Sequence, residues 1–269
     1  MQFSVLMSVY HKDNPQWLKQ AIESVLNNTI KPNEIVVAVD GPIGDELKNI
    51  LQEYEQNIPN FRNVFLPENK GRGEALNKVL PMCKYDLVAL MDADDINLPT
   101  RFELLLKEFE KNKSLSIAGG YIQEFKDINN KLSIKKVPIT NEEIYKYSKF
   151  RSPINQPTVM FKKNDILKIG GYQPLYNMED YLLWIKAVEN NLEFCNVPEV
   201  LVNMRVNDNL YIRRSGYKYF KSNKAVFDRL LKTKSINIVT YLFNITSRFI
   251  VQVLMPNSIR EIFYKKVLR

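Results

Sequence analysis

The sequence is poor in cysteine and lacks the glycine-rich motifs of the commonest nucleotide sites. Two cysteines, Cys83 and Cys195, are too few for the disulfide framework of a small secreted protein, so we expect a reducing compartment. The loop of residues 68–73 combines glycines with two cations, but it has neither the GxGxxG nor the GxxxxGK[ST] spacing. A standard dinucleotide site and a P-loop are therefore disfavoured.

Signals for export and for membrane spanning are also missing. Residues 1–10 carry no basic flank and are typical of a first strand, not of a signal peptide. The apolar stretch 236–255 is interrupted by Arg248 and several polar residues, so it falls short of the roughly 20 apolar residues of a transmembrane helix. With 269 residues and 45% hydrophobic content, the chain is long enough to bury a substantial core.

Positive charge is concentrated at the end of the chain. The net charge is +8, yet from Leu210 onward thirteen Lys and Arg face two Asp and Glu, which leaves the preceding residues at −3. The tail from Tyr211 reads as helical and amphipathic. A basic tail on a mildly acidic body indicates contact with an anionic surface, either a membrane or a nucleic acid. The alternative is a helix that packs on the domain or on a second subunit.

An apolar run that stops in three carboxylates organises the first half of the chain. Residues Leu87–Met91 are typical of a buried strand, and Asp92, Asp94 and Asp95 follow it. Such charge at a strand end is costly without compensation, and Mg²⁺ or a similar ion carrying phosphates would supply it. The alternative is that these acids only cap a helix that starts near Pro99.

Strand and helix patterns alternate around this run. Strands are expected at 3–10, 34–39, 63–66, 87–91 and 115–119, and helices after about 15, at 45–56, near 73 and from 99 to 109. This alternation predicts an α/β fold with a mostly parallel, doubly wound sheet and helices on both faces. Ligands of such sheets bind beyond the carboxyl ends of the strands.

That rule selects candidate site residues. The expected strand ends and the loops after them carry Ser8, Tyr10, Asp40, Lys70, Arg72, Asp92 and Asp94. For Asp40 the alternative is a simple turn residue, and for the loop 68–73 it is a solvated turn without a ligand.

The second half of the chain supplies a second pair of acids. Residues 121–147 are polar and are interpreted as an antiparallel hairpin or insertion, and 151–161 run from a proline-punctuated loop into a strand. Glu179 and Asp180 stand at the start of an apolar helix that runs through Val188. The helix dipole alone favours acids there; the functional interpretation is a general base facing the same crevice.

The motifs together resemble a known family. In order they are Ser8-Val9-Tyr10, Val39-Asp40-Gly41, Asn69-Lys70-Gly71 ahead of Ala75-Leu76-Asn77, Met91-Asp92-Ala93-Asp94-Asp95, and Glu179-Asp180. This series is similar to family 2 glycosyltransferases of the Rossmann-like GT-A fold, over residues 1 to about 205. The segments Asn155–Met160 and Arg213–Tyr217 further resemble bacterial enzymes that build capsule, exopolysaccharide or O-antigen repeat units.

The resemblance implies a division of the chain. Residues 1–210 are expected to form the GT-A domain, with 1–120 as the nucleotide-sugar-binding half and 121–210 as the acceptor-binding half. Residues 211–269 would be a basic helical tail that associates with a membrane or forms a dimer. The expected location is cytoplasmic, peripheral on the inner face of the cell membrane, with no nucleic acid among the partners.

Residue roles follow from the same resemblance. Asp92 and Asp94 match the DxD motif of a site for a nucleotide-sugar, most simply a UDP-sugar. Asp92 is expected at the ribose or base of the nucleotide, and Asp94 at a Mn²⁺ or Mg²⁺ ion on the diphosphate. Ser8, Tyr10, Asp40, Lys70 and Arg72 would complete the donor site. Asp180, with Glu179 beside it, matches the catalytic base. Expected acceptor contacts are Asn155, Gln156 and Trp184, and expected contacts to a diphosphate or lipid phosphate are Arg213 and Arg214.

The implied reaction is single displacement with inversion of the anomeric centre. The acceptor would be a hydroxyl of a lipid-linked saccharide in the synthesis of a surface polysaccharide such as lipopolysaccharide or capsule. Two positions depart from related enzymes: Gln156 replaces a frequent histidine, and Trp184 lies where a Gln-x-x-Arg-Trp segment is usual, so it either stacks on the acceptor sugar or belongs to the core. The remaining alternatives are a sugar nucleotidyltransferase and a non-catalytic module that binds membrane or nucleic acid.

Overall fold

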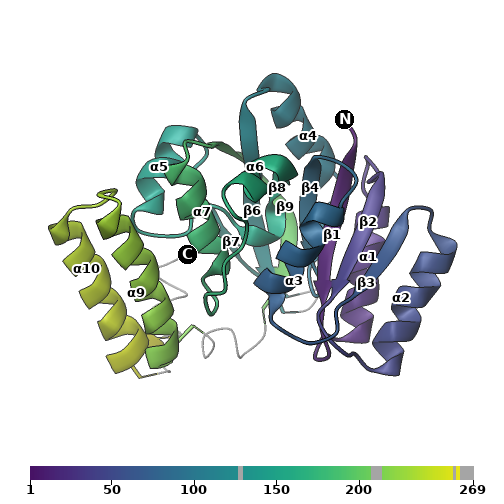
Figure 1. The fold of residues 1–269 in the computed structure, drawn as a ribbon, viewed down its shortest axis with the longest axis horizontal. Helices are drawn as coiled ribbons and strands as arrows, with labels where there is room; N and C mark the ends of the chain where they lie inside the picture. Colours follow the sequence, from purple (N-terminus) through teal and green to yellow (C-terminus); the bar gives the residue numbers. More distant parts are fainter. Residues whose placement is uncertain (127–129, 207–213, 257–258, 261–269) are drawn as a thin grey trace.

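Strands and helices alternate through the first part of the chain (Figure 1) in a computed structural model that describes residues 1–126, 130–206, 214–256 and 259–260. The strands are β1 (Phe3–Val9), β2 (Glu34–Val39), β3 (Phe61–Phe65), β4 (Leu87–Asp92), β5 (Ile96–Asn97), β6 (Leu115–Phe125), β7 (Lys131–Lys135), β8 (Met160–Lys162) and β9 (Glu193–Arg205). The helices are α1 (Pro15–Leu26), α2 (Asp45–Asn57), α3 (Arg72–Val79), α4 (Arg101–Lys111), α5 (Asn141–Ser148), α6 (Lys163–Lys168), α7 (Glu179–Glu189), α9 (Gly216–Lys232) and α10 (Ile238–Phe249), with short turns η1 (Leu80–Met82), η2 (Gln156–Thr158) and η3 (Ile250–Leu254).

One mixed sheet joins all the described strands, in the order β3-β2-β1-β4-β8-β6-β9-β5, with β7 paired to β6. Strands β3, β2, β1 and β4 are parallel, as are β6 and β9. Strand β8 lies antiparallel between β4 and β6, and β5 and β7 are antiparallel edge pairings. The predicted α/β fold with a mostly parallel sheet is confirmed, and so is the hairpin after residue 121.

Helices cover both faces of the sheet, each over its own apolar core. One core packs α1, α2 and α4 against the sheet, and its centre includes Phe3, Leu18 and Phe102. The other packs α3, α5, α6 and α7 against the opposite face, around Leu90 and Trp184. Strands β2 and β4 are continuously apolar because both of their faces are covered.

Strand β9 is the principal element that the sequence did not indicate. Its 13 residues contain Pro198 and Glu199, and proline within a run argues against a central strand. The register against β6 shifts at this point, since Gly120 pairs with Val197 and Tyr121 pairs with Val200. The proline is therefore accommodated in a bulge and takes no place in the ladder.

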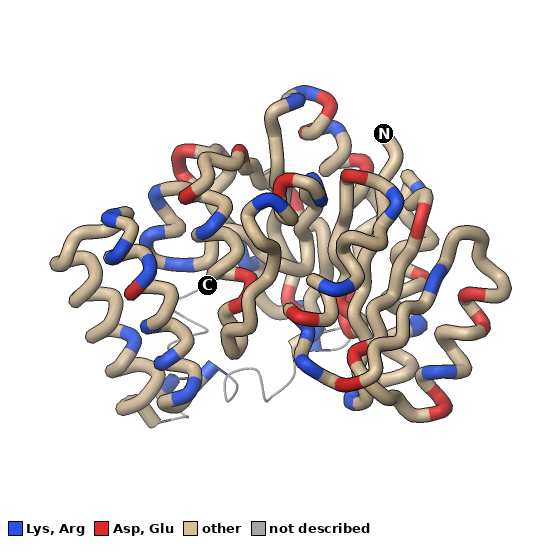
Figure 2. The backbone as a smooth tube through the Cα atoms, in the orientation of Figure 1, with Lys and Arg blue, Asp and Glu red and all other residues tan. Residues whose placement is uncertain are grey.

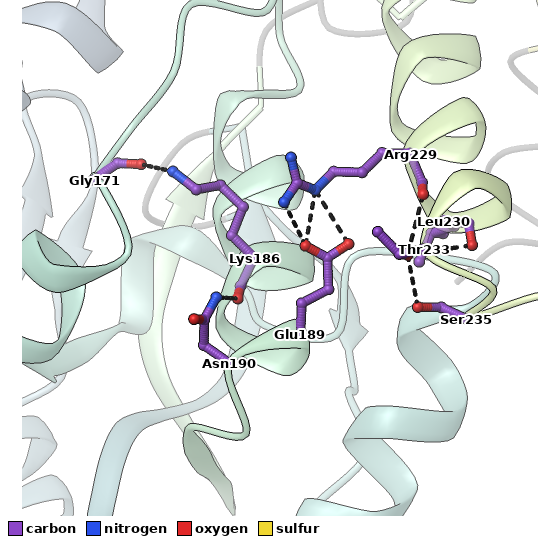
Figure 3. Close-up of polar contacts among 8 residues, drawn as sticks. All are labelled: Gly171, Lys186, Glu189, Asn190, Arg229, Leu230, Thr233 and Ser235. Carbon is purple, nitrogen blue, oxygen red and sulfur yellow. Dashed lines mark hydrogen bonds and ion pairs between the residues drawn. The ribbon is translucent and has the colours of Figure 1, made fainter.

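Helices α9 and α10 lie to the side of α7 and form a third cluster with it (Figure 1). Tyr181 on α7 packs edge-on against Phe227 of α9. Arg229 of α9 binds the Glu189 carboxylate through two nitrogens, with Nε–Oε2 at 2.9 Å, as Figure 3 shows. The tail is thus fastened to the helix that begins at Glu179.

The two helices differ in their surfaces. Lysine and arginine recur along α9 (Figure 2). Helix α10 instead exposes large apolar side chains, among them Val239 at 70% and Leu242 at 55%. None of the helices in the described part of the chain combines the length and apolar character needed to cross a bilayer.

Candidate active site

A cavity of about 730 Å³ lies beyond the carboxyl ends of β1 and β4 and extends to α7, α9 and α10. Ten of the predicted site residues line it: Ser8, Tyr10, Arg72, Asp92, Asp94, Asn155, Gln156, Glu179, Asp180 and Arg214. The parallel register explains the first part of this gathering, because Ser8 pairs with Asp92 across β1 and β4. Residues from both halves of the sequence therefore face one space.

Arg72, the first residue of α3, connects the two groups of acids in this cavity. Its guanidinium forms a close ion pair with the Asp92 carboxylate. Burial by itself would lower the pKa of Arg72, but Asp92 and, to a smaller extent, Glu179 and Asp180 raise it above its ordinary value. Arg72 thus lies within electrostatic reach of both carboxylate groups, and a ligand contact of the loop before α3 stays a prediction.

Asp40 holds the loop that carries Arg72. Its two carboxylate oxygens accept hydrogen bonds from the Lys70 and Gly71 amides, each at 2.9 Å. The loop packs directly on Gly41, which has a positive φ of 80° and no space for a Cβ beside the backbone of Asn69. Asp40 is buried outside the cavity lining, so its observed role is to position the loop.

The Lys70 side chain binds a different carboxylate from the one that its amide binds. It forms an ion pair of 2.7 Å with Glu68 at the surface and is not part of the cavity lining. The predicted contacts of Lys70 and Asp40 with a donor nucleotide stay predictions.

The acids after β4 are not helix caps. Thr100 is the N-cap residue of α4, without a side-chain capping bond. Asp95 is 2% exposed and accepts a hydrogen bond of 2.8 Å from the Arg205 amide of β9. Burial, followed by repulsion from Asp94 and Asp92, raises the pKa of Asp95 well above its usual range. The capping alternative is therefore wrong.

A fourth carboxylate, which the sequence did not single out, joins this group. Asp13 lines the cavity and accepts a hydrogen bond of 2.9 Å from the Tyr10 amide. Burial raises its pKa to about 7, and the nearby Asp94 and Asp92 contribute to the rise. Asp13 lies in a turn of ordinary composition, so only the folded arrangement reveals it.

This acidic end suits a divalent ion that is completed by a substrate. Mg²⁺ and Mn²⁺ sites commonly use one or two carboxylates and phosphate oxygens. Among the described residues, no three His, Cys, Asp or Glu side chains converge as a complete metal site. Asp92 and Asp94 are the residues available to hold such an ion, and they face the cavity.

Asp180 lies in the first turn of α7 with its charge supported from several sides. Its Oδ1 accepts a hydrogen bond of 2.7 Å from the Tyr181 amide. Burial raises the pKa of Asp180, while that amide and the cations Arg72, Lys135 and Arg214 oppose the rise. A half-buried carboxylate with an elevated pKa is suited to accept a proton.

Glu179 begins the helix beside it. Burial and then the neighbouring Asp180 raise the pKa of Glu179. Both acids occupy the first turn of α7, where the helix dipole stabilises them, and both line the cavity. Stabilisation by the helix dipole and a position facing the cavity are therefore compatible for Glu179 and Asp180.

Asn155 and Gln156 line the cavity, and each binds through its side-chain amide nitrogen. Asn155 donates to the Gly120 carbonyl at 2.9 Å, and Gln156 donates to the Tyr172 hydroxyl at 2.7 Å. Their oxygens, Asn155 Oδ1 and Gln156 Oε1, are buried without a hydrogen-bond partner among the described residues. Such atoms are candidate acceptors for a sugar hydroxyl.

Trp184 requires a correction. It is completely buried in the core between the sheet and α7, and it does not line the cavity. The indole therefore has no face to offer an acceptor sugar, and the core interpretation of Trp184 is the right one.

The cavity is also lined by cations that the sequence only partly indicated. Arg214 lines the cavity as expected, whereas Arg213 lies outside the described residues. Lys135 at the end of β7 and Arg151 after α5 line it too. Neither residue follows a strand of the expected parallel sheet, so no pattern marked them.

The fold and the site define a glycosyltransferase. The profile described as Glycosyl transferase family 2 matches residues 4–169, and the chain belongs to this family. The predicted enzyme class and family are therefore confirmed, and the nucleotidyltransferase and non-catalytic alternatives are set aside.

Two bacterial relatives extend along the whole chain. The chain is 39% identical over 269 residues to a UDP-Gal:alpha-D-GlcNAc-diphosphoundecaprenol beta-1,3-galactosyltransferase of Escherichia coli, covering 100% of this chain and 97% of that protein. It is 33% identical to the amylovoran biosynthesis glycosyltransferase AmsE of Erwinia amylovora, covering 98% of each chain. The predicted resemblance to polysaccharide-building enzymes is confirmed.

A solved structure agrees with the predicted fold. The mannosyltransferase PcManGT from Pyrobaculum calidifontis, in complex with GDP-Man and Mn²⁺, superposes with a TM-score of 0.64 at 13% identity. The match covers 96% of this chain and 71% of that one. At this identity the likeness concerns the fold, which is that of GT-A glycosyltransferases.

Proposed function

We propose that this protein transfers a sugar from a UDP-sugar to a hydroxyl of a lipid-linked saccharide, with a divalent metal ion and with inversion of the anomeric centre. The observation that carries the proposal is the arrangement of the cavity: Asp92 and Asp94 line the same space as Asp180, and Arg72 interacts with both groups. The full-length similarity to the galactosyltransferase of Escherichia coli supports a UDP-sugar donor and a lipid diphosphate acceptor.

Asp180 is the proposed general base. Its carboxylate accepts the proton of the acceptor hydroxyl while that oxygen attacks the anomeric carbon from the side opposite the departing diphosphate. The raised pKa brings Asp180 closer to the pH of the cytoplasm than an ordinary aspartate, which strengthens it as a base. Glu179 lies beside it, and burial followed by the Asp180 charge raises the pKa of Glu179.

The acidic end holds the donor in this proposal. Asp94 would bind Mn²⁺ or Mg²⁺, and such an ion neutralises the charge of the leaving diphosphate when it is bound, while Asp92 would contact the nucleotide. Arg72 would also stabilise the negative charge of the diphosphate, because its guanidinium is held beside Asp92. Ser8 and Tyr10 lie beside Asp92 at the ends of neighbouring strands, where the nucleoside is expected.

The tail is proposed to rest on the cytoplasmic leaflet of the membrane. Helix α10 exposes Val239 and Leu242, and α9 beside it is basic, which is the combination that binds anionic lipid. The same surfaces would serve a homo-oligomer if two tails met. Substituting glutamate at Val239 and Leu242 should abolish sedimentation with anionic vesicles without changing the monomer mass, whereas a change in mass alone would favour the oligomer.

A transfer assay tests the central claim. Purified protein is incubated with a panel of nucleotide-sugars and a GlcNAc-diphosphate-alkyl acceptor, with Mn²⁺, Mg²⁺ or EDTA. We expect transfer from one UDP-sugar that requires the metal, and a β-linked product from an α-linked donor by NMR. An α-linked product would overturn inversion, and undiminished transfer in EDTA would overturn metal dependence.

A further inference from the structure

Three cations from distant parts of the chain gather in the part of the cavity next to Asp180. Lys135 ends β7, Arg151 follows α5, and Arg214 precedes α9, yet all three line the same cavity. None of the three side chains is fully exposed. Bringing like charges together away from water is unfavourable unless an anion compensates them.

The pKa of Lys135 indicates that the three cations lie near one another. Burial, followed by repulsion from Arg214 and Arg151, lowers the pKa of Lys135 to about 7, and Asp180 opposes this only in part. Among the described residues, Asp180 is the carboxylate that acts on Lys135, and Asp180 also faces Arg72. A ligand with more than one negative charge would complement three cations gathered in this way.

The position of the cluster relative to the base limits what that ligand is. Lys135 and Arg214 act directly on Asp180, so the cations begin next to the carboxylate that faces the acceptor hydroxyl. The donor diphosphate is assigned to the acidic end with Asp92 and Asp94. An anion at the cationic end therefore belongs to the acceptor.

We propose that Lys135, Arg151 and Arg214 form a second anion site that binds the diphosphate joining the acceptor sugar to its lipid. The inference rests on the proposed function and adds to it a substrate requirement. Because the cluster adjoins Asp180, the sugar that bears the attacked hydroxyl is the one attached to the diphosphate. Acceptors with a further sugar between the two would place the phosphates beyond the cluster.

The test compares a charged with a neutral acceptor. UDP-Gal is the donor, and the acceptors are GlcNAc-α-diphosphate carrying a short alkyl chain and the uncharged alkyl α-GlcNAc glycoside. The variants are Lys135→Met, Arg151→Gln and Arg214→Gln, and Lys48→Met on the exposed surface of α2 is the matched control. Assays are run at saturating donor and at pH 6, where Lys135 carries its charge.

The expected result is selective. Each variant should lose about ten- to a hundredfold in kcat/KM for the diphosphate acceptor, through KM, as expected for one charge-assisted contact. The neutral acceptor and the KM for UDP-Gal should change less than about twofold, the scatter expected for a site remote from the change. Lys48→Met should match the wild type with both acceptors.

Two outcomes would overturn the inference. Equal losses with the charged and neutral acceptors would mean that the cations only tune Asp180 or support the fold. Equal efficiency of the wild-type protein with both acceptors would remove the diphosphate site while leaving sugar transfer intact. Failure of the wild type to transfer to either acceptor, from any UDP-sugar, would instead overturn the proposed function.

Discussion

The two ends of the cavity carry opposite charge. At one end Asp13, Asp92, Asp94 and Asp95 gather beyond β1 and β4, and at the other a cationic cluster faces Asp180. Burial is the largest cause of the raised pKa of Asp13 and of the lowered pKa of Lys135, and like charges nearby add to each shift. The proposals assign a separate ligand to each end: a divalent ion with the donor at the acidic end, and the acceptor diphosphate at the cationic end.

The largest effect is expected at Asp180, the proposed general base. Replacing Asp180 with Asn removes the proton acceptor but keeps the shape of the side chain. We expect kcat to fall by about 10²- to 10⁴-fold, the usual contribution of a general base. UDP binding with Mn²⁺, measured by calorimetry, should remain. Glu179→Gln serves as the control with a smaller loss, and a larger loss in Glu179→Gln would reassign the base to Glu179.

The acidic end can be tested separately from the cationic cluster. In Asp94→Asn the loss of one carboxylate should weaken metal-dependent UDP binding and lower kcat/KM by at least about a hundredfold, since a catalytic metal is worth several kcal/mol. Binding of the diphosphate acceptor in the absence of donor should persist. Calorimetric titrations with each ligand separate the two effects, and loss of both would indicate that the variant is misfolded.

The cationic end should respond to pH. Lys135 has a lowered pKa of about 7, so it is charged below pH 7 and loses its charge above it. The groups that face it are Arg214, Arg151 and Asp180. The KM for a diphosphate acceptor should therefore rise about three- to tenfold between pH 6 and pH 8, as one charge-assisted contact is lost. Lys135→Arg keeps its charge and should flatten this dependence, and an unchanged slope in that variant would exclude Lys135 as the source.

The smallest effect concerns stability of the metal-free protein. The pKa of Asp13 is raised to about 7, so the folded state retains a proton that the unfolded state releases near pH 4. Its contribution therefore becomes unfavourable as the pH rises from about 4 to 7. Asp13→Asn should raise the free energy of unfolding by about 1 kcal/mol at pH 7.5, or Tm by roughly 2–4 °C, with little effect at pH 4. Thermal melts at both values check this, and an equal gain at pH 4 would exclude titration as the cause.

The sequence predicts the acidic end better than the cationic end for a physical reason. Strand β4 is an apolar run that ends at Asp92, and the mostly apolar strand β1 ends one residue after Ser8; parallel pairing brings these ends together. No comparable rule joins Lys135 to Arg214, because they come from a hairpin and from the segment before a packed helix. Only the tertiary arrangement of the second half reveals the cluster.

Three other features of the structure also depend on contacts that the sequence pattern does not show. Strand β9 escaped notice because Pro198 interrupts it, and Trp184 was ambiguous because an apolar helix does not reveal which face is buried. Asp40 was correctly placed at a strand end. However, that its oxygens bind the backbone of the loop 68–73 depends on a contact 30 residues away.

The fastening of the tail to the catalytic domain has a consequence for the choice of acceptor. Arg248 of α10 reaches the Phe150 carbonyl, and Asn244 beside it lines the cavity, so the tail forms part of the active-site wall. The family profile ends at residue 169, before Asp180 and Arg214. Under the proposed function, the part of the chain beyond residue 169 would supply the base, Arg214 and a wall of the acceptor space, so a substitution in the tail would alter acceptor choice as well as any contact with a membrane.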